Sequence, residues 1–301
     1  MWPVETKFRN VKTTNERYEP EMDVRIRIPY NTTAYRYANE RLILAFTLFL
    51  VFFVIALTAT ATVCLSFVFV VAMVALSYAL SRSHHRSLME RARQVTPQDM
   101  PALAALAAES MDRLQPGLVH VFVAPSNRLN AYTFGLSSPK VVVLHAPLLQ
   151  VMDADEIRFI LGHELGHVRL GHTRLNSLVG GMAGIPSPFV ASAILTMAFL
   201  WWNRACEYSA DRAGLLACGK PHKAITALVK LAAGKDARTR AGLERTLQRI
   251  EAEDDHALSG LGEALTTHPM MVRRIEKLRR YAASNEYQRL RARMDQNVEN
   301  T

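Results

Sequence analysis

His163-Glu164-Leu165-Gly166-His167 is the stretch that decides how this chain folds and what chemistry it can carry. It has the form H-E-x-x-H, and residues four apart lie on one face of a helix. Two imidazoles on one face can bind a single Zn²⁺, and the glutamate beside the first can reach a water molecule at the metal. The pentapeptide therefore predicts a helix with His163 and His167 as zinc ligands.

An acidic pair, Glu207 and Asp211, follows about forty residues later in Glu207-Tyr208-Ser209-Ala210-Asp211. Catalytic zinc commonly takes three protein ligands and leaves a fourth position for water. We expect Glu207 to be the third ligand. Asp211, one helical turn further, is then placed to accept a hydrogen bond from a ligand histidine and fix its tautomer. The alternative for this pair is a solvated helix face.

Glu164 is expected to stay off the metal and to act as general base on the attacking water, then as proton carrier to the leaving amine. The alternative is a solvent-facing or capping glutamate. The predicted reaction is zinc-dependent hydrolysis of a peptide bond, with one Zn²⁺ per chain.

The remaining histidines and the cysteines predict no further metal ligand. His172 follows His167 by five residues, a spacing that points off the ligand face, and His145 is expected to be structural. Cys206 is adjacent to Glu207, and neighbours on a helix point about 100° apart, so the two would not share one ion. The three cysteines, an odd and sparse set, form no disulfide framework and fit a reducing compartment.

Residues 42–80 contain no charged residue, a stretch of 39 positions. One helical crossing of a bilayer needs about 20 residues. We predict two membrane helices at about 42–57 and 63–80; one long tilted helix is the alternative. Basic residues flank both ends, which places both in the cytoplasm. The net charge of +9 is therefore attributed to membrane flanks, and no nucleic-acid-binding motif accompanies it.

A second apolar run, residues 178–202, is uncharged and is divided by Pro186 and Pro188. It separates the H-E-x-x-H helix from Glu207, so both of its ends must return to one site. We expect a helical hairpin insert that dips into the membrane or packs on the anchors; a hairpin buried in the protein core is the alternative.

The rest of the chain is mostly helical by pattern. Three β-rich runs predict a small antiparallel sheet, and Asp153 is expected to cap the motif helix. The expected strands are 118–124, 131–134 and 141–144, and the expected helices are 96–115, 154–175, 191–216, 221–233, 240–252 and 269–283. Residues 1–40 are a polar segment without an assigned role, and residues 284–301 are expected to form a frayed polar tail.

Together these residues resemble the gluzincin membrane metallopeptidases of the HtpX and CAAX-prenyl-protease kind, peptidase family M48. The resemblance covers about residues 95–280. It rests on the two zinc-ligand motifs, on two anchors before the catalytic domain, and on three further segments: Asn130-Ala131-Tyr132, Val141 to Leu149, and Thr267-His268-Pro269 with Arg274-Ile275. The apolar insert is shorter, and the polar start longer, than in the family.

The resemblance implies an α+β, mainly α, zincin-type domain at residues 95–283 with zinc endopeptidase activity, preceded by a transmembrane helical hairpin at 41–81. It implies that His268 and Arg274 line the cleft, where His268 would stabilise the oxyanion; an ordinary capping role is the alternative for His268. It also implies that an extended polypeptide substrate pairs as an added strand with residues 140–144. The substrate-binding residues would then be Asn130, Ala131, Val141, Val142 and Val143.

The sequence thus predicts a multi-pass membrane zinc endopeptidase that faces the cytoplasm, in keeping with a bacterial inner membrane, with a role in membrane protein quality control. A maturation protease dedicated to one substrate and a catalytically silent zinc-binding scaffold are the rivals. The presence of every catalytic residue argues against silence. The sequence does not specify the oligomeric state.

Overall fold

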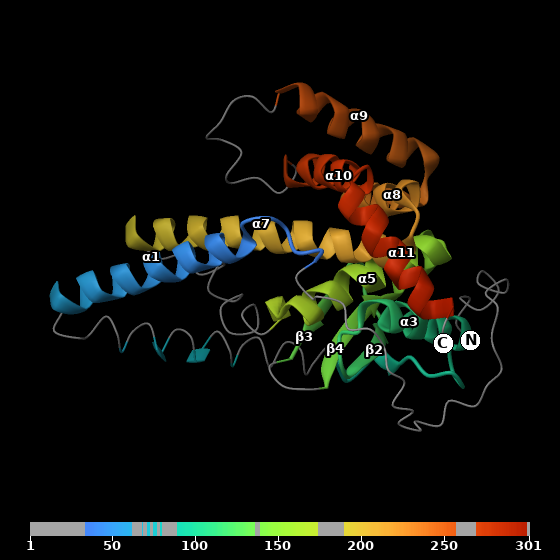
Figure 1. Ribbon diagram of the computed structural model, residues 1–301, viewed down its shortest axis with the longest axis horizontal. Coiled ribbons are helices and arrows are strands. Elements are labelled where there is room, and N and C mark those ends of the chain that lie inside the picture. The colour runs from blue at the N-terminus through green and yellow to red at the C-terminus, as the bar shows by residue number, and fades with distance from the viewer. Residues whose placement is uncertain are drawn as a thin grey trace.

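The computed structural model describes residues 34–61, 89–135, 139–173, 190–256 and 269–299, with a few isolated positions between 68 and 79. Several predicted segments lie outside these ranges: the polar start, most of the second apolar helix at 63–80, the first half of the apolar insert, and His268. The described residues fold mainly as helices packed around one small sheet (Figure 1).

The sheet has four strands in the order β1-β2-β4-β3. Both outer pairs are antiparallel, whereas β2 and β4 are parallel, so the prediction of an antiparallel sheet is wrong for the central pair. The apolar run Val142-Val143-Leu144 is fully buried, as a strand flanked on both sides requires. The strands are β1 (Arg93–Gln94), β2 (Val119–Ala124), β3 (Ala131–Phe134) and β4 (Lys140–His145).

The place of β4 corrects the predicted mode of substrate binding. Val141, Val142 and Val143 each pair with a residue of β2 on one side and of β3 on the other. Both edges of β4 are therefore occupied, and a substrate strand cannot add to it. The outer strand on this side of the sheet is β3.

Helix α5 (Ala154–Leu170) carries the H-E-x-x-H motif, and its start is as predicted. The Asp153 side chain accepts from the backbone N–H of Glu156, whose carboxylate accepts from the N–H of Asp153, forming a capping box. The helix ends five residues earlier than expected, at Leu170. Gly171 follows with φ +83°, a left-handed conformation that terminates helices and suits glycine.

The other helices largely follow the predicted pattern, with two corrections. The first soluble helix begins at Pro101, because the Thr96 hydroxyl accepts from Asp99 N in a turn before it. The predicted frayed tail is a helix, in which Tyr287, Leu290 and Met294 are buried. The bounds are α1 (Glu40–Ala61), α3 (Pro101–Leu114), α4 (Ala146–Val151), α7 (Val190–Cys218), α8 (Pro221–Ala233), η2 (Gly234–Arg238), α9 (Arg240–His256), α10 (Pro269–Ala282) and α11 (Asn285–Glu299).

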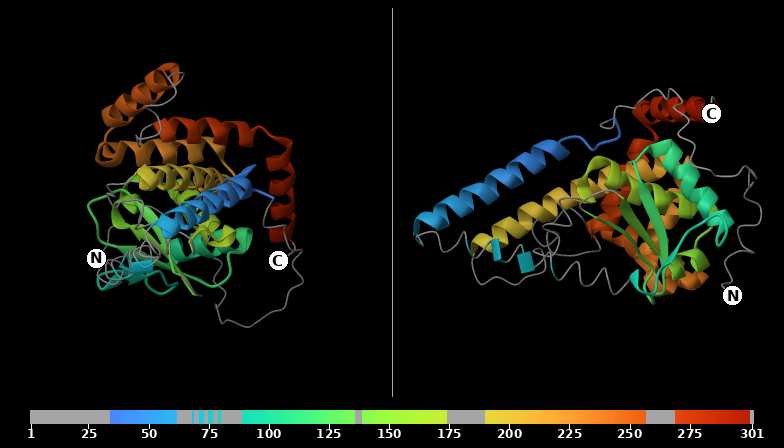
Figure 2. Two further views of the ribbon diagram at one scale, coloured as in Figure 1. Left: turned by 90° about the vertical axis from the view of Figure 1, so that its left-hand side faces the viewer. Right: turned by 90° about the horizontal axis from the view of Figure 1, so that it is seen from below.

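Helices α1 and α7 lie side by side and project from the rest of the molecule, as both views in Figure 2 show. Ile43 of α1 packs against Trp202, Ala205 and Cys206 of α7 at the base of this projection. In the part of the chain that the structure describes, no helix meets the length and hydropathy that a membrane span requires. The second arm of the predicted insert is the first half of α7, continuous with the helix that carries Glu207.

Helix α5 lies between the sheet and α7, and small residues bring α5 and α7 into close contact. A Cβ added to Gly162 would lie 2.4 Å from Cβ of Ala217, and one added to Gly166 would lie 2.5 Å from Cβ of Ala213. Real Cβ atoms do not approach so closely, so each position requires glycine. This close approach brings the side chains of the two helices within reach of one another.

A methyl group at position 162 should therefore force α5 and α7 apart. We expect Gly162→Ala to lower the free energy of unfolding by about 1–3 kcal/mol, the usual cost of overpacking. Ala217→Gly removes the nearest obstacle and leaves Cα of Gly214, at 3.0 Å, as the next. A double-mutant cycle measured by urea unfolding should show that the second change relieves the first; strictly additive effects would contradict this contact.

Candidate metal centre

Two helices far apart in sequence place three ligand side chains together. His163 and His167 lie one turn apart on α5, and Glu207 reaches them from α7. The two Nε2 atoms are 3.2 Å apart, and the Glu207 carboxylate lies 3.5 Å from Nε2 of His163 and 3.4 Å from Nε2 of His167. The predicted ligand set is thus assembled, as one of two groups of described side chains that could hold a metal ion.

These separations fit a tetrahedral zinc ion. Zinc bonds to nitrogen and oxygen of about 2.0–2.1 Å place two ligand atoms of a tetrahedron about 3.3 Å apart. The three measured separations, 3.2, 3.4 and 3.5 Å, lie around that value. Three protein ligands leave the fourth corner for water or substrate, which is the arrangement of catalytic zinc sites.

Asp211 fixes the tautomer of His163. Its Oδ1 lies 3.0 Å from Nδ1 of His163. Burial opposes its ionisation, but Arg274 outweighs burial and lowers the pKa of Asp211, so this carboxylate only accepts hydrogen bonds. Nδ1 of His163 must therefore be the donor, which leaves the lone pair on Nε2 directed at the other two ligands. This is the role predicted for Asp211.

Arg274 of α10 binds both acidic residues of α7. Its Nε and Nη2 donate to the two oxygens of Asp211 at 2.8 and 2.7 Å, and its Nη1 lies 3.0 Å from Oε2 of Glu207. Burial would raise the pKa of Glu207, but Arg274 and the two imidazoles outweigh it and hold that pKa well below its usual range. Arg274 therefore keeps Glu207 ionised and ready to bind a cation.

The centre attracts positive charge. Burial opposes protonation of His163, yet Asp211 and Glu207 outweigh it and raise the pKa of this imidazole. The carboxylates that draw a proton here would draw a divalent cation by the same Coulomb attraction. Glu164 is also buried, at 7% exposed, and burial raises the pKa of its carboxyl. A general base with a raised pKa removes protons more effectively near neutral pH.

The residues predicted to bind substrate are placed on the sheet. The carbonyl of Asn130 accepts from the backbone N–H of His145, and Ala131 begins β3. The ring of His145 contacts the carbonyl of Arg128 through Nδ1 at 3.2 Å, away from the ligand triad, in keeping with a structural role.

His172 is close to the metal centre, which sequence reasoning missed. Its Nδ1 lies 3.0 Å from Nδ1 of His167, and its Nε2 lies 3.1 Å from the carboxylate of Glu40 on α1. Burial lowers the pKa of His172 to about 4, although Glu40 opposes this. His172 is not among the three converging ligands. The one signal in the sequence was Gly171, which ends the helix and redirects the chain.

Comparison with known proteins agrees with this geometry. The sequence pattern of peptidase family M48 matches residues 97–282, more than half of the chain. The chain is 29% identical over 206 residues to a plastoglobule-localized metallopeptidase 48 of Arabidopsis thaliana, covering 64% of this chain and 59% of that protein. It therefore spans less than two thirds of the length of that relative.

Bacterial relatives agree. An HtpX protease homologue of Bifidobacterium longum is 25% identical over 64% of this chain and 74% of its own length. The HtpX protease of Acinetobacter baumannii is 26% identical over 58% and 70%. The converging H-E-x-x-H and Glu-x-x-x-Asp residues lie inside the matched region, and the chain therefore belongs to peptidase family M48 as an HtpX-like metallopeptidase.

Proposed function

We propose that this chain is a zinc-dependent endopeptidase that uses Glu164 as its general base. The observation that carries the proposal is the convergence of His163, His167 and Glu207 at 3.2–3.5 Å. Lone pairs and a carboxylate held so close repel one another unless a cation lies between them. The residues therefore fit zinc by their donor types and by their spacing.

Each side chain then has a defined part in peptide hydrolysis. Zinc, when bound, would act as a Lewis acid that polarises the scissile carbonyl and lowers the pKa of water toward about 7. Glu164 takes the proton of the attacking water and delivers it to the leaving amine. Asp211 and Arg274 hold the ligands in place. His268 directly precedes α10, the helix that brings Arg274 to the centre, and we assign it to the oxyanion.

The exchange of Glu164 for Gln tests the assignment of the base. Glutamine keeps the shape of the side chain but accepts no proton, and removal of a general base costs about 10²–10⁴-fold in rate. We expect Glu164→Gln to lose casein cleavage to that extent while metal analysis still finds about one zinc per chain. A chelator should abolish the activity of the natural chain. Undiminished cleavage by the zinc-loaded variant would refute the role of Glu164.

We further propose that an extended polypeptide substrate pairs with β3. This is the outer strand next to β4, and it contacts α5. The carbonyl of Asn130 accepts from β4, so alternation along an antiparallel strand directs the backbone groups of Ala131 and Thr133 away from β4. These groups could bond an added strand.

Ala131→Pro tests this mode of binding. Proline removes the outward N–H of residue 131 while Asn130 still accepts from β4. We expect the variant to raise KM for long peptides with kcat, zinc content and thermal unfolding near those of the natural chain. Ala131→Val, which retains the N–H, is the matched control. An unchanged KM in the proline variant would show that substrate does not pair at this edge.

We also propose that α1 attaches the protein to a lipid bilayer, together with residues 63–80. Large apolar side chains of α1 are exposed, each by 47% or more: Leu42, Phe46, Leu48, Phe49, Phe52 and Phe53. A patch of this kind is stable in contact with lipid and unstable in water. Basic residues on both flanks favour a catalytic domain on the cytoplasmic side. A protease held there would meet membrane polypeptides, which supports a role in quality control.

Membrane attachment predicts a defined response to charge on α1. We expect the natural chain to remain in the membrane fraction after alkaline carbonate extraction. Phe49→Asp with Phe52→Asp should release a substantial part of it, because aspartate near the centre of a bilayer costs about 2.5–3.5 kcal/mol. Arg245→Asp, on an exposed position of α9, is the control. Full extraction of the natural chain by carbonate would refute the attachment.

A further inference from the structure

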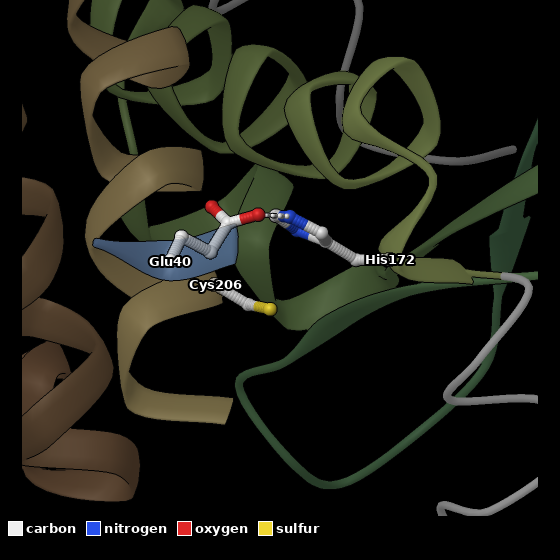
Figure 3. A group of neighbouring side chains, drawn as sticks. All are labelled: Glu40, His172 and Cys206. Carbon is white, nitrogen blue, oxygen red and sulfur yellow. Dashed lines mark hydrogen bonds and ion pairs between the residues drawn. The ribbon is translucent and has the colours of Figure 1, made fainter. Parts of the chain in front are cut away.

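A buried chain of hydrogen bonds joins the metal centre to α1. Nδ1 of His167 lies 3.0 Å from Nδ1 of His172, and Nε2 of His172 lies 3.1 Å from Oε1 of Glu40. All three side chains are buried. Figure 3 shows the carboxylate of Glu40, at the start of α1, directed at the imidazole of His172. The first residue of an apolar helix is thus linked, through one side chain, to a predicted zinc ligand.

The carboxylate of Glu40 is held as an acceptor from several sides. Arg36 forms an ion pair with its Oε1, and the hydroxyl of Ser209 donates to its Oε2. The backbone N–H of Tyr37 donates to the same hydroxyl at 2.8 Å. Because Ser209 belongs to α7, these contacts also fasten the start of α1 to the helix that carries Glu207. An ionised carboxylate accepts hydrogen bonds and donates none.

The proton positions along the chain follow from this acceptor. Nε2 of His172 must carry the hydrogen that Glu40 accepts. A neutral imidazole has one N–H, so Nδ1 of His172 is left as an acceptor. His167 must then donate through Nδ1, and its Nε2 keeps the lone pair that a metal needs. A doubly protonated His172 would instead set two N–H groups against each other at 3.0 Å.

We propose that Glu40, acting through His172, positions the imidazole of His167 for zinc binding. The proposal rests on the proposed function, because it takes His167 to be a zinc ligand. Asp211 acts in the same way on His163, so each histidine ligand has its own buried anchor. Glu40 lies outside residues 97–282, the region that matches the peptidase family. The helix before the catalytic domain therefore supplies part of the metal centre.

A second metal ion is the competing explanation of this cluster. Ligand atoms of Glu40, His172 and Cys206 all lie within 4.8 Å of one another. Two observations favour hydrogen bonds instead. Arg36 already places a positive charge on Glu40. A metal on Nε2 of His172 would also move the imidazole hydrogen to Nδ1, against the N–H of His167. Figure 3 draws a contact between Glu40 and His172 and none to Cys206.

Zinc affinity of the full chain tests the proposal. His172→Phe removes the acceptor for His167, and Glu40→Leu removes the acceptor for His172. We expect each to weaken zinc binding about 10- to 100-fold in competition with a chromogenic chelator, the usual effect of losing a partner of a metal ligand. Glu40→Gln retains an acceptor oxygen and should recover most of the affinity. The visible spectrum of the Co²⁺-substituted protein should change in the first two variants and not in the third.

Two control variants separate positioning from helix docking and from a second metal. Ile43→Ala loosens the packing of α1 on Trp202 and leaves the hydrogen bonds intact, so it should lower Tm without weakening zinc binding. Cys206→Ser should leave the metal content at one per chain. Equal loss of affinity in Ile43→Ala and Glu40→Leu, unchanged affinity in all variants, or two metals per chain with one lost in Cys206→Ser would each overturn the proposal. A natural chain that binds no zinc would instead refute the proposed function.

Discussion

The close contact between α5 and α7 is the constraint on which the rest of the structure depends. Gly162 and Gly166 on one helix face Ala213 and Ala217 on the other with no space for a further carbon atom. Only at that distance can Glu207 reach the two imidazoles of α5. The capping box at Asp153 and the left-handed Gly171 fix where α5 begins and ends, and so fix which of its residues face α7.

Electrostatics completes what the packing begins. Three acceptor atoms converge at one point, and their mutual repulsion is tolerable only because groups behind them are paired. Arg274 offsets the charge of Asp211 and Glu207, and Asp211 directs the proton of His163 away from the centre. A buried arginine that holds two carboxylates is costly to desolvate, and hydrogen bonds to both partners compensate for that cost.

The sequence predicts the metal centre better than it predicts the sheet. His163, His167 and Glu207 follow from helical spacing and zinc chemistry, because both are local rules. The position of β4 between β2 and β3 depends on pairing between distant segments, which alternation of residue types does not encode. The contact of His172 with His167 was missed for a related reason: spacing on a helix no longer applies after Gly171. The terminal helix α11 was missed because its buried residues are few among many polar ones.

Helix α7 has a consequence for how distant events are felt at the site. Its 29 residues form one unbroken rod of about 44 Å, at 1.5 Å per residue, with an apolar end near Val190 and Glu207 further along. A rod of this kind transmits rotation about its axis with little slack. Whatever surrounds the apolar end, whether lipid or protein, therefore sets the angle at which the glutamate meets the two rings.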